Sequence, residues 1–145
     1  MIAARRGLPL LRTTALVAAT VWLTDLITLG IKLSVDRPRP FEVLEEADPL
    51  IVASVGTSFP SGHASMSAAG AIVLASLAPR AWPLLALLAV VVAVSRVYVG
   101  VHYPLDVLAG LALGTIVGTA VVLGLRRLRR TSGAPLRSAA PPRRG

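Results

Sequence analysis

Apolar stretches with nearly enough residues to cross a lipid bilayer as helices recur along this chain, and they limit the possible folds more than any other feature. They cover residues 13–31, 61–78, 84–98 and 104–125, the last boundary being approximate. A helix of roughly 20 mostly apolar residues crosses the hydrocarbon core of a membrane. The sequence therefore predicts an all-α fold, a membrane helical bundle with about four transmembrane helices.

The chain has room for one domain, because 145 residues are too few for two of ordinary size. We expect residues 1–130 to form the transmembrane domain and residues 131–145 to be a disordered, basic cytoplasmic tail rich in Pro, Ser, Ala and Arg. Residues 32–60 form a polar connection, since Pro38 and Pro40 prevent a regular helix at its start. The absence of cysteine excludes disulfides, thiolate metal sites and cysteine nucleophiles.

Basic residues predict the orientation of the bundle. The net charge is +8, and seven arginines follow residue 125, directly after an apolar stretch. Such a cluster marks a cytoplasmic membrane flank, and no aromatic-basic alternation supports nucleic-acid binding. With both termini cytoplasmic, these arginines share the inner face with Arg5, Arg6, Arg12 and Arg80. We therefore expect a multi-pass protein of the cell membrane, in contact with its lipids, whose 32–60 connection is extracytoplasmic.

The start of the chain resembles a secretory signal only superficially. Its apolar stretch is long, no small-residue cleavage pattern follows it, and it leads directly into charged residues. We expect a retained membrane helix.

Three polar clusters remain once the apolar stretches are set aside: residues 32–40, 60–63 and 95–106. Lysine and arginine bind phosphate, arginine as a planar fork. Ser61 is placed to cap a helix, so that the amides of Gly62 and His63 form an anion site at its positive end. Gly62 also lets an anion approach the backbone closely.

The third cluster places a histidine beside an acid. His102 lies just before a predicted helix whose first turn contains Asp106. A carboxylate can hold one ring N–H of a histidine, fix its tautomer and leave the other nitrogen as a nucleophile. His63 could then donate the proton that a leaving oxygen requires.

Each of these features alone has a structural explanation. An acid suits the first turn of any helix, and an arginine at a membrane edge is often an anchor. The chain nevertheless has two histidines and one lysine, and all three fall in the clusters. Because the predicted orientation brings the clusters to the same face, including the turn at His102, we interpret them as one site.

In these clusters the sequence resembles the type 2 phosphatidic acid phosphatase family, which shares a superfamily with bacterial acid phosphatases and vanadium haloperoxidases. The family signature is Lys, six residues, Arg-Pro; then Pro-Ser-Gly-His; then Ser-Arg, five residues, His, three residues, Asp. Here it runs in order and at full spacing from Lys32 to Asp106. The resemblance implies an integral membrane phosphatase that acts through a phosphohistidine and needs no metal or other cofactor.

The resemblance also implies a role for each matching residue. His102 would attack phosphorus, Asp106 would orient it, and His63 would protonate the leaving group and later activate water. The phosphoryl oxygens would be held by Lys32, Arg39, Ser61, Gly62 and Arg96. Fixed cations and amides would then stabilise the transition state electrostatically.

A lipid phosphate is the expected substrate, because a site at the outer surface suits a lipid whose head group reaches the polar connection. Polyprenyl phosphates or diphosphates come first, with phosphatidic acid and phosphatidylglycerol phosphate as close competitors. The alternatives are a vanadate-dependent peroxidase, which the membrane setting disfavours, and a catalytically silent scaffold or transport subunit, which the intact histidine pair disfavours.

The chain departs from the family in the number of helices. Membrane members typically have six, about two of them before the first motif, whereas this chain has one apolar stretch there. A minimal member, a truncated reading frame and a homo-oligomer that completes the bundle are the three alternatives.

Two further features lie within the apolar stretches. Gly110, Gly114 and Gly118 recur at four-residue spacing, which predicts close helix packing. Asp25 lies inside the first stretch, where a carboxylate is costly and faces a partner or a cavity. We expect it to form a hydrogen bond within the bundle.

Overall fold

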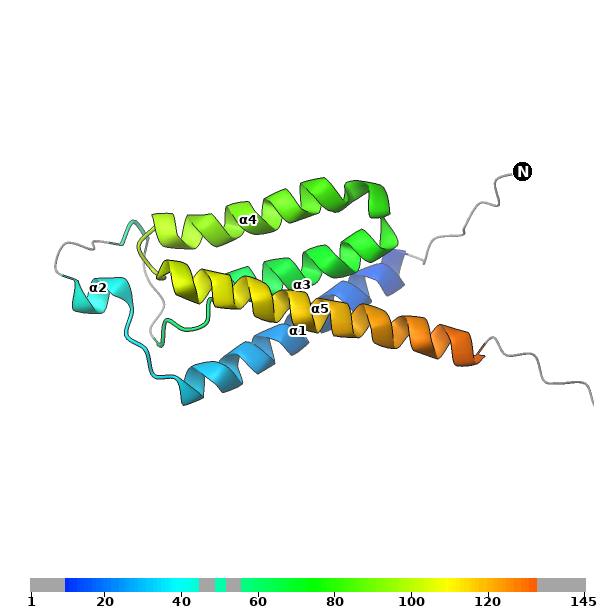
Figure 1. Cartoon of the computed structure of the whole chain (residues 1–145), viewed down its shortest axis with the longest axis horizontal. Helices are drawn as coiled ribbons and strands as arrows, with labels where there is room; N and C mark the ends of the chain where they lie inside the picture. Colours follow the sequence, from blue (N-terminus) through cyan, green and yellow to red (C-terminus); the bar gives the residue numbers. More distant parts are fainter. Residues whose placement is uncertain (1–9, 45–48, 52–55, 133–145) are drawn as a thin grey trace, which may run out of the picture.

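The computed structural model describes residues 10–44, 49–51 and 56–132, which form a helical bundle (Figure 1). Its elements are α1 (Leu10–Ser34), α2 (Pro40–Val43), α3 (Gly62–Leu77), a 3₁₀ turn (Pro79–Ala81), α4 (Trp82–Tyr98) and α5 (Pro104–Ser132). No strand occurs in these described ranges. The predicted all-α class is confirmed.

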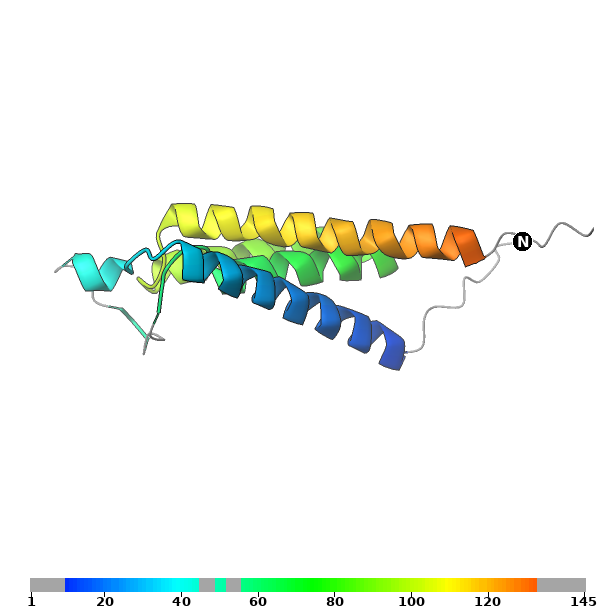
Figure 2. The same cartoon turned by 90° about the horizontal axis from the view of Figure 1, so that it is seen from below.

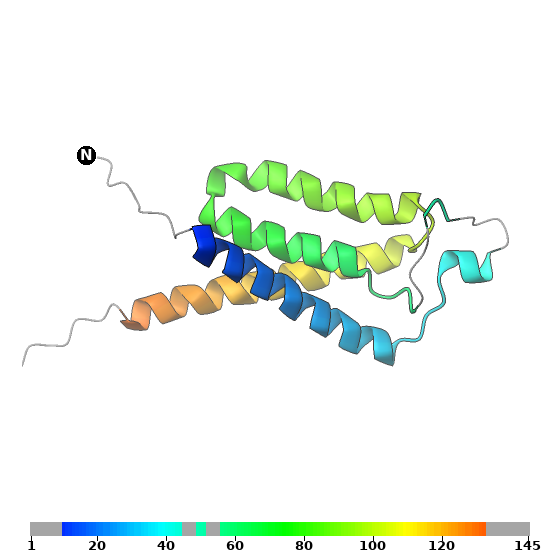
Figure 3. The same cartoon turned by 180° about the vertical axis from the view of Figure 1, so that it is seen from behind.

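Successive long helices run in opposite directions, as Figures 1 and 3 show. Helix α3 is central and packs against α1, α4 and α5. The end of α1, the start of α3, the end of α4 and the start of α5 meet at one end of the bundle, next to α2. The three polar clusters therefore come together at that end.

Within the part of the chain that the structure describes, three helices are long and apolar enough to cross a membrane: α1, α5, and α4 together with its preceding turn. Helix α3 is apolar but has only 16 residues. At 1.5 Å per residue it spans about 24 Å, less than the ~30 Å of a hydrocarbon core. The four expected spans therefore correspond to three full-length helices and one short helix enclosed by them.

Close backbone contact joins α5 to α3. A Cβ added at Gly114 would lie 2.0 Å from the Ser65 carbonyl oxygen, and one at Gly110 would lie 2.5 Å from that of Ser61. At Gly118 the corresponding distance to the Ala69 carbonyl oxygen is 2.9 Å. No side chain fits at these separations, so the predicted packing role of the glycine row is confirmed.

Helix α1 is inclined to the rest of the bundle, and its first turns lie away from α5 (Figure 2). Its buried residues are Thr20, Thr24 and Thr28. Each threonine hydroxyl donates a hydrogen bond of 2.8 Å to the carbonyl oxygen four residues earlier. Because these hydroxyls form hydrogen bonds within the helix, the row of three threonines can pack in the interior of the bundle.

The structure extends one predicted boundary. Helix α5 continues past Leu125 through four arginines to Ser132, so Thr131 and Ser132 belong to the helix and not to a disordered tail. Arginine is a good helix former, and the Thr131 hydroxyl bonds to the Leu128 carbonyl oxygen at 2.9 Å. The remainder of the expected tail, and Arg5 and Arg6, lie outside the described residues.

Candidate active site

A polar cavity of about 410 Å³ lies at the end of the bundle where the clusters meet. Six of the eight predicted site residues line it: Lys32, Arg39, Gly62, His63, Arg96 and His102. Four other residues complete the lining: Asp25, Ile51, Met66 and Val101. The remaining two predicted residues, Ser61 and Asp106, are fully buried and do not line the cavity.

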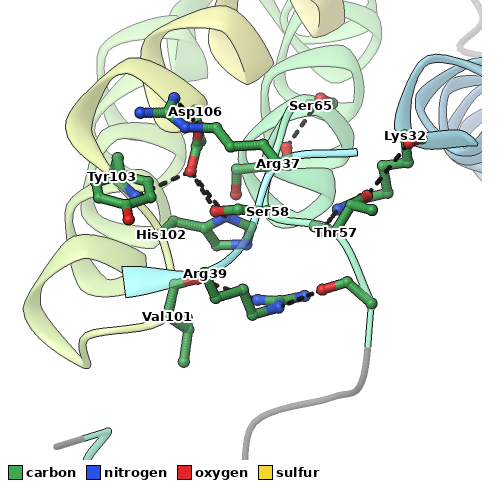
Figure 4. Close-up of polar contacts among 12 residues, drawn as sticks. Lys32, Arg37, Arg39, Thr57, Ser58, Ser65, Val101, His102, Tyr103 and Asp106 are labelled. Carbon is green, nitrogen blue, oxygen red and sulfur yellow. Dashed lines mark hydrogen bonds and ion pairs between the residues drawn. The ribbon is translucent and has the colours of Figure 1, made fainter. Parts of the chain in front are cut away.

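Two of the cavity's cations also hold the loops in place (Figure 4). Lys32, in the last turn of α1, donates from Nζ to the Thr57 carbonyl oxygen at 2.6 Å. Arg39 precedes α2 and donates from Nε to the Gly56 carbonyl oxygen at 2.9 Å and from Nη1 to that of Val101 at 3.0 Å. The first two bonds hold the two ends of the connection between α1 and α3 together, and the bond to Val101 ties this connection to the loop that carries His102.

His102 lies in the loop between α4 and α5. Gly100, with φ of +77°, provides the left-handed turn that leaves α4. The imidazole is 5% exposed, so the loop inserts it into the protein and does not present it to solvent.

Asp106 is held by three donors from different segments (Figure 4). Its Oδ2 accepts hydrogen bonds from the Ser58 hydroxyl and, at 2.9 Å, from the Tyr103 amide. Its Oδ1 accepts one from Arg37 Nη1 at 2.8 Å. The carboxylate is fully buried, so these bonds replace the water that it loses.

The contact between Asp106 and His102 is indirect. His102 Nδ1 lies 3.6 Å from Asp106 Oδ2, too far for a good hydrogen bond, and 3.4 Å from the Ser58 hydroxyl. If Ser58 donates to Asp106, its oxygen accepts from the Nδ1–H group of His102. That arrangement leaves Nε2 with its lone pair.

The surroundings keep His102 neutral. Burial lowers the pKa of its imidazole to about 4, and the positive charges of Arg39 and Lys32 act in the same direction. Asp106 and Ser58 act the other way but do not outweigh them. A neutral ring at neutral pH is what a nitrogen nucleophile requires.

Ser61 occupies the N-cap position of α3, but the predicted side-chain cap is not formed. Its Oγ is buried and has no hydrogen-bond partner within the described residues. The Ser61 amide donates instead to the Asp106 carbonyl oxygen at 2.9 Å, which anchors the start of α3 to α5. Among the described residues this hydroxyl is therefore unsatisfied, and it does not line the cavity.

Two residues that the sequence analysis did not select belong to this arrangement. Ser58 precedes the Pro-Ser-Gly-His motif, and Arg37 lies within the first cluster beside Arg39. Arg37 also stacks over the Tyr103 ring, with its Cζ atom 4.2 Å from the ring centre. Both were missed because their shared partner, Asp106, lies far away in the sequence, in the first turn of α5. For Arg37 the available signal was the additional Arg-Pro pair that it forms with Pro38.

Asp25 does not form the hydrogen bond that we expected within the bundle. In the described part of the chain its side chain has no hydrogen-bond or ion-pair partner, and it lines the cavity. No group of three or more His, Asp and Glu side chains that could hold a metal occurs among the described residues.

Among the described residues, the bundle combines apolar helices of membrane-spanning length with a cation-lined cavity that contains His102. Comparison with known proteins gives the family: the profile of the PAP2 superfamily matches residues 13–130, which include the whole site. The chain belongs to this superfamily. The resemblance based on the three motifs is confirmed.

Three relatives illustrate the match. An undecaprenyl-diphosphatase of Sulfolobus acidocaldarius is 45% identical over 78 residues, or 53% of this chain and 38% of that protein. A decaprenylphosphoryl-5-phosphoribose phosphatase of Mycobacterium tuberculosis is 39% identical over 120 residues, or 79% of this chain and 63% of that protein. A solved structure, the transmembrane PAP2 type phosphatidylglycerolphosphate phosphatase of Bacillus subtilis, has a TM-score of 0.67 and 28% identity over 80% of this chain and 60% of that one. The chain thus matches less than two thirds of each relative's length.

Proposed function

We propose that this protein is an integral membrane phosphatase that hydrolyses a lipid phosphate through a phosphohistidine on His102. The observation that carries the proposal is the state of His102, which is buried, neutral and oriented through Nδ1. It lines a cavity with Lys32, Arg39 and Arg96. A phosphoryl group bound by these cations would lie within reach of a nitrogen nucleophile.

The first half-reaction transfers the phosphoryl group to the protein. The Nε2 lone pair of His102 forms a bond to phosphorus while the bond from phosphorus to the leaving oxygen breaks. His63, in the first turn of α3, gives its proton to that oxygen. The lipid alcohol, or the lipid phosphate when the substrate is a diphosphate, then departs.

The second half-reaction restores the histidine. His63 takes a proton from a water molecule whose oxygen attacks phosphorus, and the N–P bond breaks so that Nε2 recovers its electron pair. Throughout, Lys32, Arg39 and Arg96 stabilise the charge on the phosphoryl oxygens. The Gly62 amide completes this cradle.

Lipid phosphates fit the site's position in the bundle. The cavity lies at the ends of helices that cross a membrane, where a lipid head group would lie. The relatives are named for polyprenyl and phosphatidylglycerol phosphate substrates. With the basic end of α5 in the cytoplasm, the cavity opens on the extracytoplasmic side and both termini are cytoplasmic.

Rapid-quench detection of acid-labile, base-stable phosphoprotein tests the mechanism. The full chain in detergent should form it, and His102→Ala should form none and should not turn over. His63→Ala should retain more phosphoprotein formation with an aryl phosphate than with a lipid phosphate, because a good leaving group needs less protonation. Its phosphoprotein should also persist longer, because the same residue activates water.

Equal phosphoprotein in His102→Ala and the parent would refute the nucleophile. An equal loss on both substrates in His63→Ala would leave His102 as the nucleophile but make His63 a phosphate-binding residue. Asp106→Asn should fall between the two histidine variants, since it leaves the nucleophile present but poorly oriented.

A further inference from the structure

One charged residue of the cavity, Asp25, is not part of the family signature. Asp25 is on α1, seven residues before Lys32 and thus about 10 Å further into the bundle. Its Oδ1 lies 4.0 Å from the position that a Cβ on Gly62 would take, beside the first turn of α3. A carboxylate at this depth is costly unless the cavity or a ligand solvates it.

The charges around the cavity are unevenly distributed. Lys32, Arg39 and Arg96 are its cations, and Asp25 is the only acid among the described residues that line it. Two other acids lie nearby without lining the cavity. Asp106 is buried behind His102 and paired with Arg37, and Glu42 accepts a hydrogen bond from the Arg39 amide. The cavity therefore has a cationic part suited to a phosphoryl group and, deeper in the bundle, a carboxylate beside Met66.

The proposed mechanism places the leaving group at the deeper part. Attack by His102 expels the leaving oxygen on the opposite side of phosphorus, where His63 protonates it. Helix α3 continues inward from His63, and Met66 lies one turn further along it. Atoms joined to the leaving oxygen would therefore meet Asp25 and Met66.

From this placement, and resting on the proposed function, we infer that Asp25 selects the substrate by its leaving group. A carboxylate accepts strong hydrogen bonds from hydroxyl groups and repels anions. The site should prefer phosphate monoesters that carry a hydroxyl within a few bonds of the ester oxygen. It should disfavour lipid diphosphates, whose leaving group is itself an anionic phosphate.

Three probes with the full chain in detergent test this selectivity: lysophosphatidic acid, its analogue without the free hydroxyl, and farnesyl diphosphate. The parent should hydrolyse lysophosphatidic acid with a kcat/KM about tenfold or more above that of the analogue, the usual effect of one hydrogen bond to a charged group. Asp25→Ala should lose this preference. Asp25→Asn, which keeps an acceptor but removes the charge, should keep part of it and hydrolyse farnesyl diphosphate about tenfold faster.

Asp36→Asn is the matched control. Asp36 is an exposed acid near the same end of the bundle, but it does not line the cavity. In this variant the kcat/KM values for the three probes should keep the same ratios as in the parent. Equal changes on all probes in the Asp25 variants, or the same change in Asp36→Asn, would overturn the inference while the phosphatase proposal stands. A parent that releases phosphate from none of the probes, and forms no phosphoprotein with an aryl phosphate, would overturn both.

Discussion

Arg37 Nη1 lies 2.8 Å from Asp106 Oδ1, although the two residues are 69 positions apart in the chain. The carboxylate is fully buried, whereas the arginine side chain is 33% exposed. The pair joins the loop after α1 to the first turn of α5, and so fixes the acid that lies behind His102. Because Arg37 does not line the cavity, we predict that it acts on the site through Asp106 and not through a contact with the phosphoryl group.

Replacing Arg37 should therefore affect turnover more than substrate binding. Arg37→Ala leaves a buried acceptor without its partner, which should lower the free energy of unfolding by about 1–3 kcal/mol. We expect kcat to fall at least about tenfold with KM little changed, and Arg37→Lys to restore part of kcat. Steady-state kinetics and thermal unfolding in detergent measure both effects. A rise in KM at constant kcat would instead make Arg37 a phosphate ligand.

The Ser58 hydroxyl gives a second prediction, since it lies between Asp106 and His102. Ser58→Ala removes the acceptor for His102 Nδ1–H and should lower kcat by roughly 10- to 100-fold, the scale of one misdirected catalytic hydrogen bond. Ser58→Thr keeps the hydroxyl and should recover most of this loss. Unchanged kcat in Ser58→Ala would show that the 3.6 Å contact between His102 and Asp106 suffices.

The titration of His102 gives a third prediction. Its pKa of about 4 lies below the ordinary value of 6.5, chiefly because of burial. His63→Gln leaves His102 as the single histidine of the chain. The imidazole signals of this variant in an NMR titration should change near pH 4, and Lys32→Met in the same background should move that change upward. A midpoint near 6.5 would contradict the burial of the ring.

The same shift sets how stability depends on pH. Between about pH 4 and 6.5 the unfolded chain binds a proton at His102 that the folded chain does not. The contribution of His102 to the free energy of unfolding is therefore fully present above pH 6.5 and declines as the pH falls towards 4. His102→Gln should reduce this dependence.

Sequence reasoning found six of the residues that line the cavity, because the motifs are defined by residue spacing, which can be read without a structure. It placed His63, His102 and Lys32 at one end of the bundle from the order of the apolar stretches and the charge pattern. It could not find Ser58 or Arg37, because their shared partner, Asp106, is far away in the sequence and no periodicity links them. It also misjudged Asp25: depth in an apolar stretch identifies a costly carboxylate, but only packing shows whether a protein group or a cavity faces it.

Local propensity had a similar limit at the helix ends. The 16 residues of α3 were counted as a full span because composition does not show that neighbouring helices enclose them. Conversely, α5 continues through its arginines to Ser132, where the change from apolar to basic residues suggested an end. A change in polarity marks a membrane boundary more reliably than the end of a helix.

The glycine row predicts how tightly α5 packs on α3. Gly114→Ala places a Cβ 2.0 Å from the Ser65 carbonyl oxygen, a contact that requires the helices to separate. We expect a lower folded yield and a fall in thermal stability, and Gly114→Leu should be worse. Gly124→Ala is the matched control, because nothing lies within 4 Å of its added Cβ. Equal stability of the two alanine variants would mean that this face does not pack as described.

The last prediction concerns orientation in the membrane. Val43, in α2, and Thr131, near the end of α5, are both exposed and lie at opposite ends of the bundle (Figure 1). The chain contains no cysteine, so Val43→Cys and Thr131→Cys each introduce the single thiol. In intact cells a membrane-impermeant maleimide should label Val43→Cys alone, because the basic end of α5 favours the cytoplasm. Thr131→Cys should become labelled once the membrane is permeabilised, which shows that its thiol is reactive. Labelling of Thr131→Cys alone in intact cells would mean that the bundle has the opposite orientation, with the cavity on the cytoplasmic side. Labelling of both variants would contradict an arrangement in which the two ends face opposite compartments.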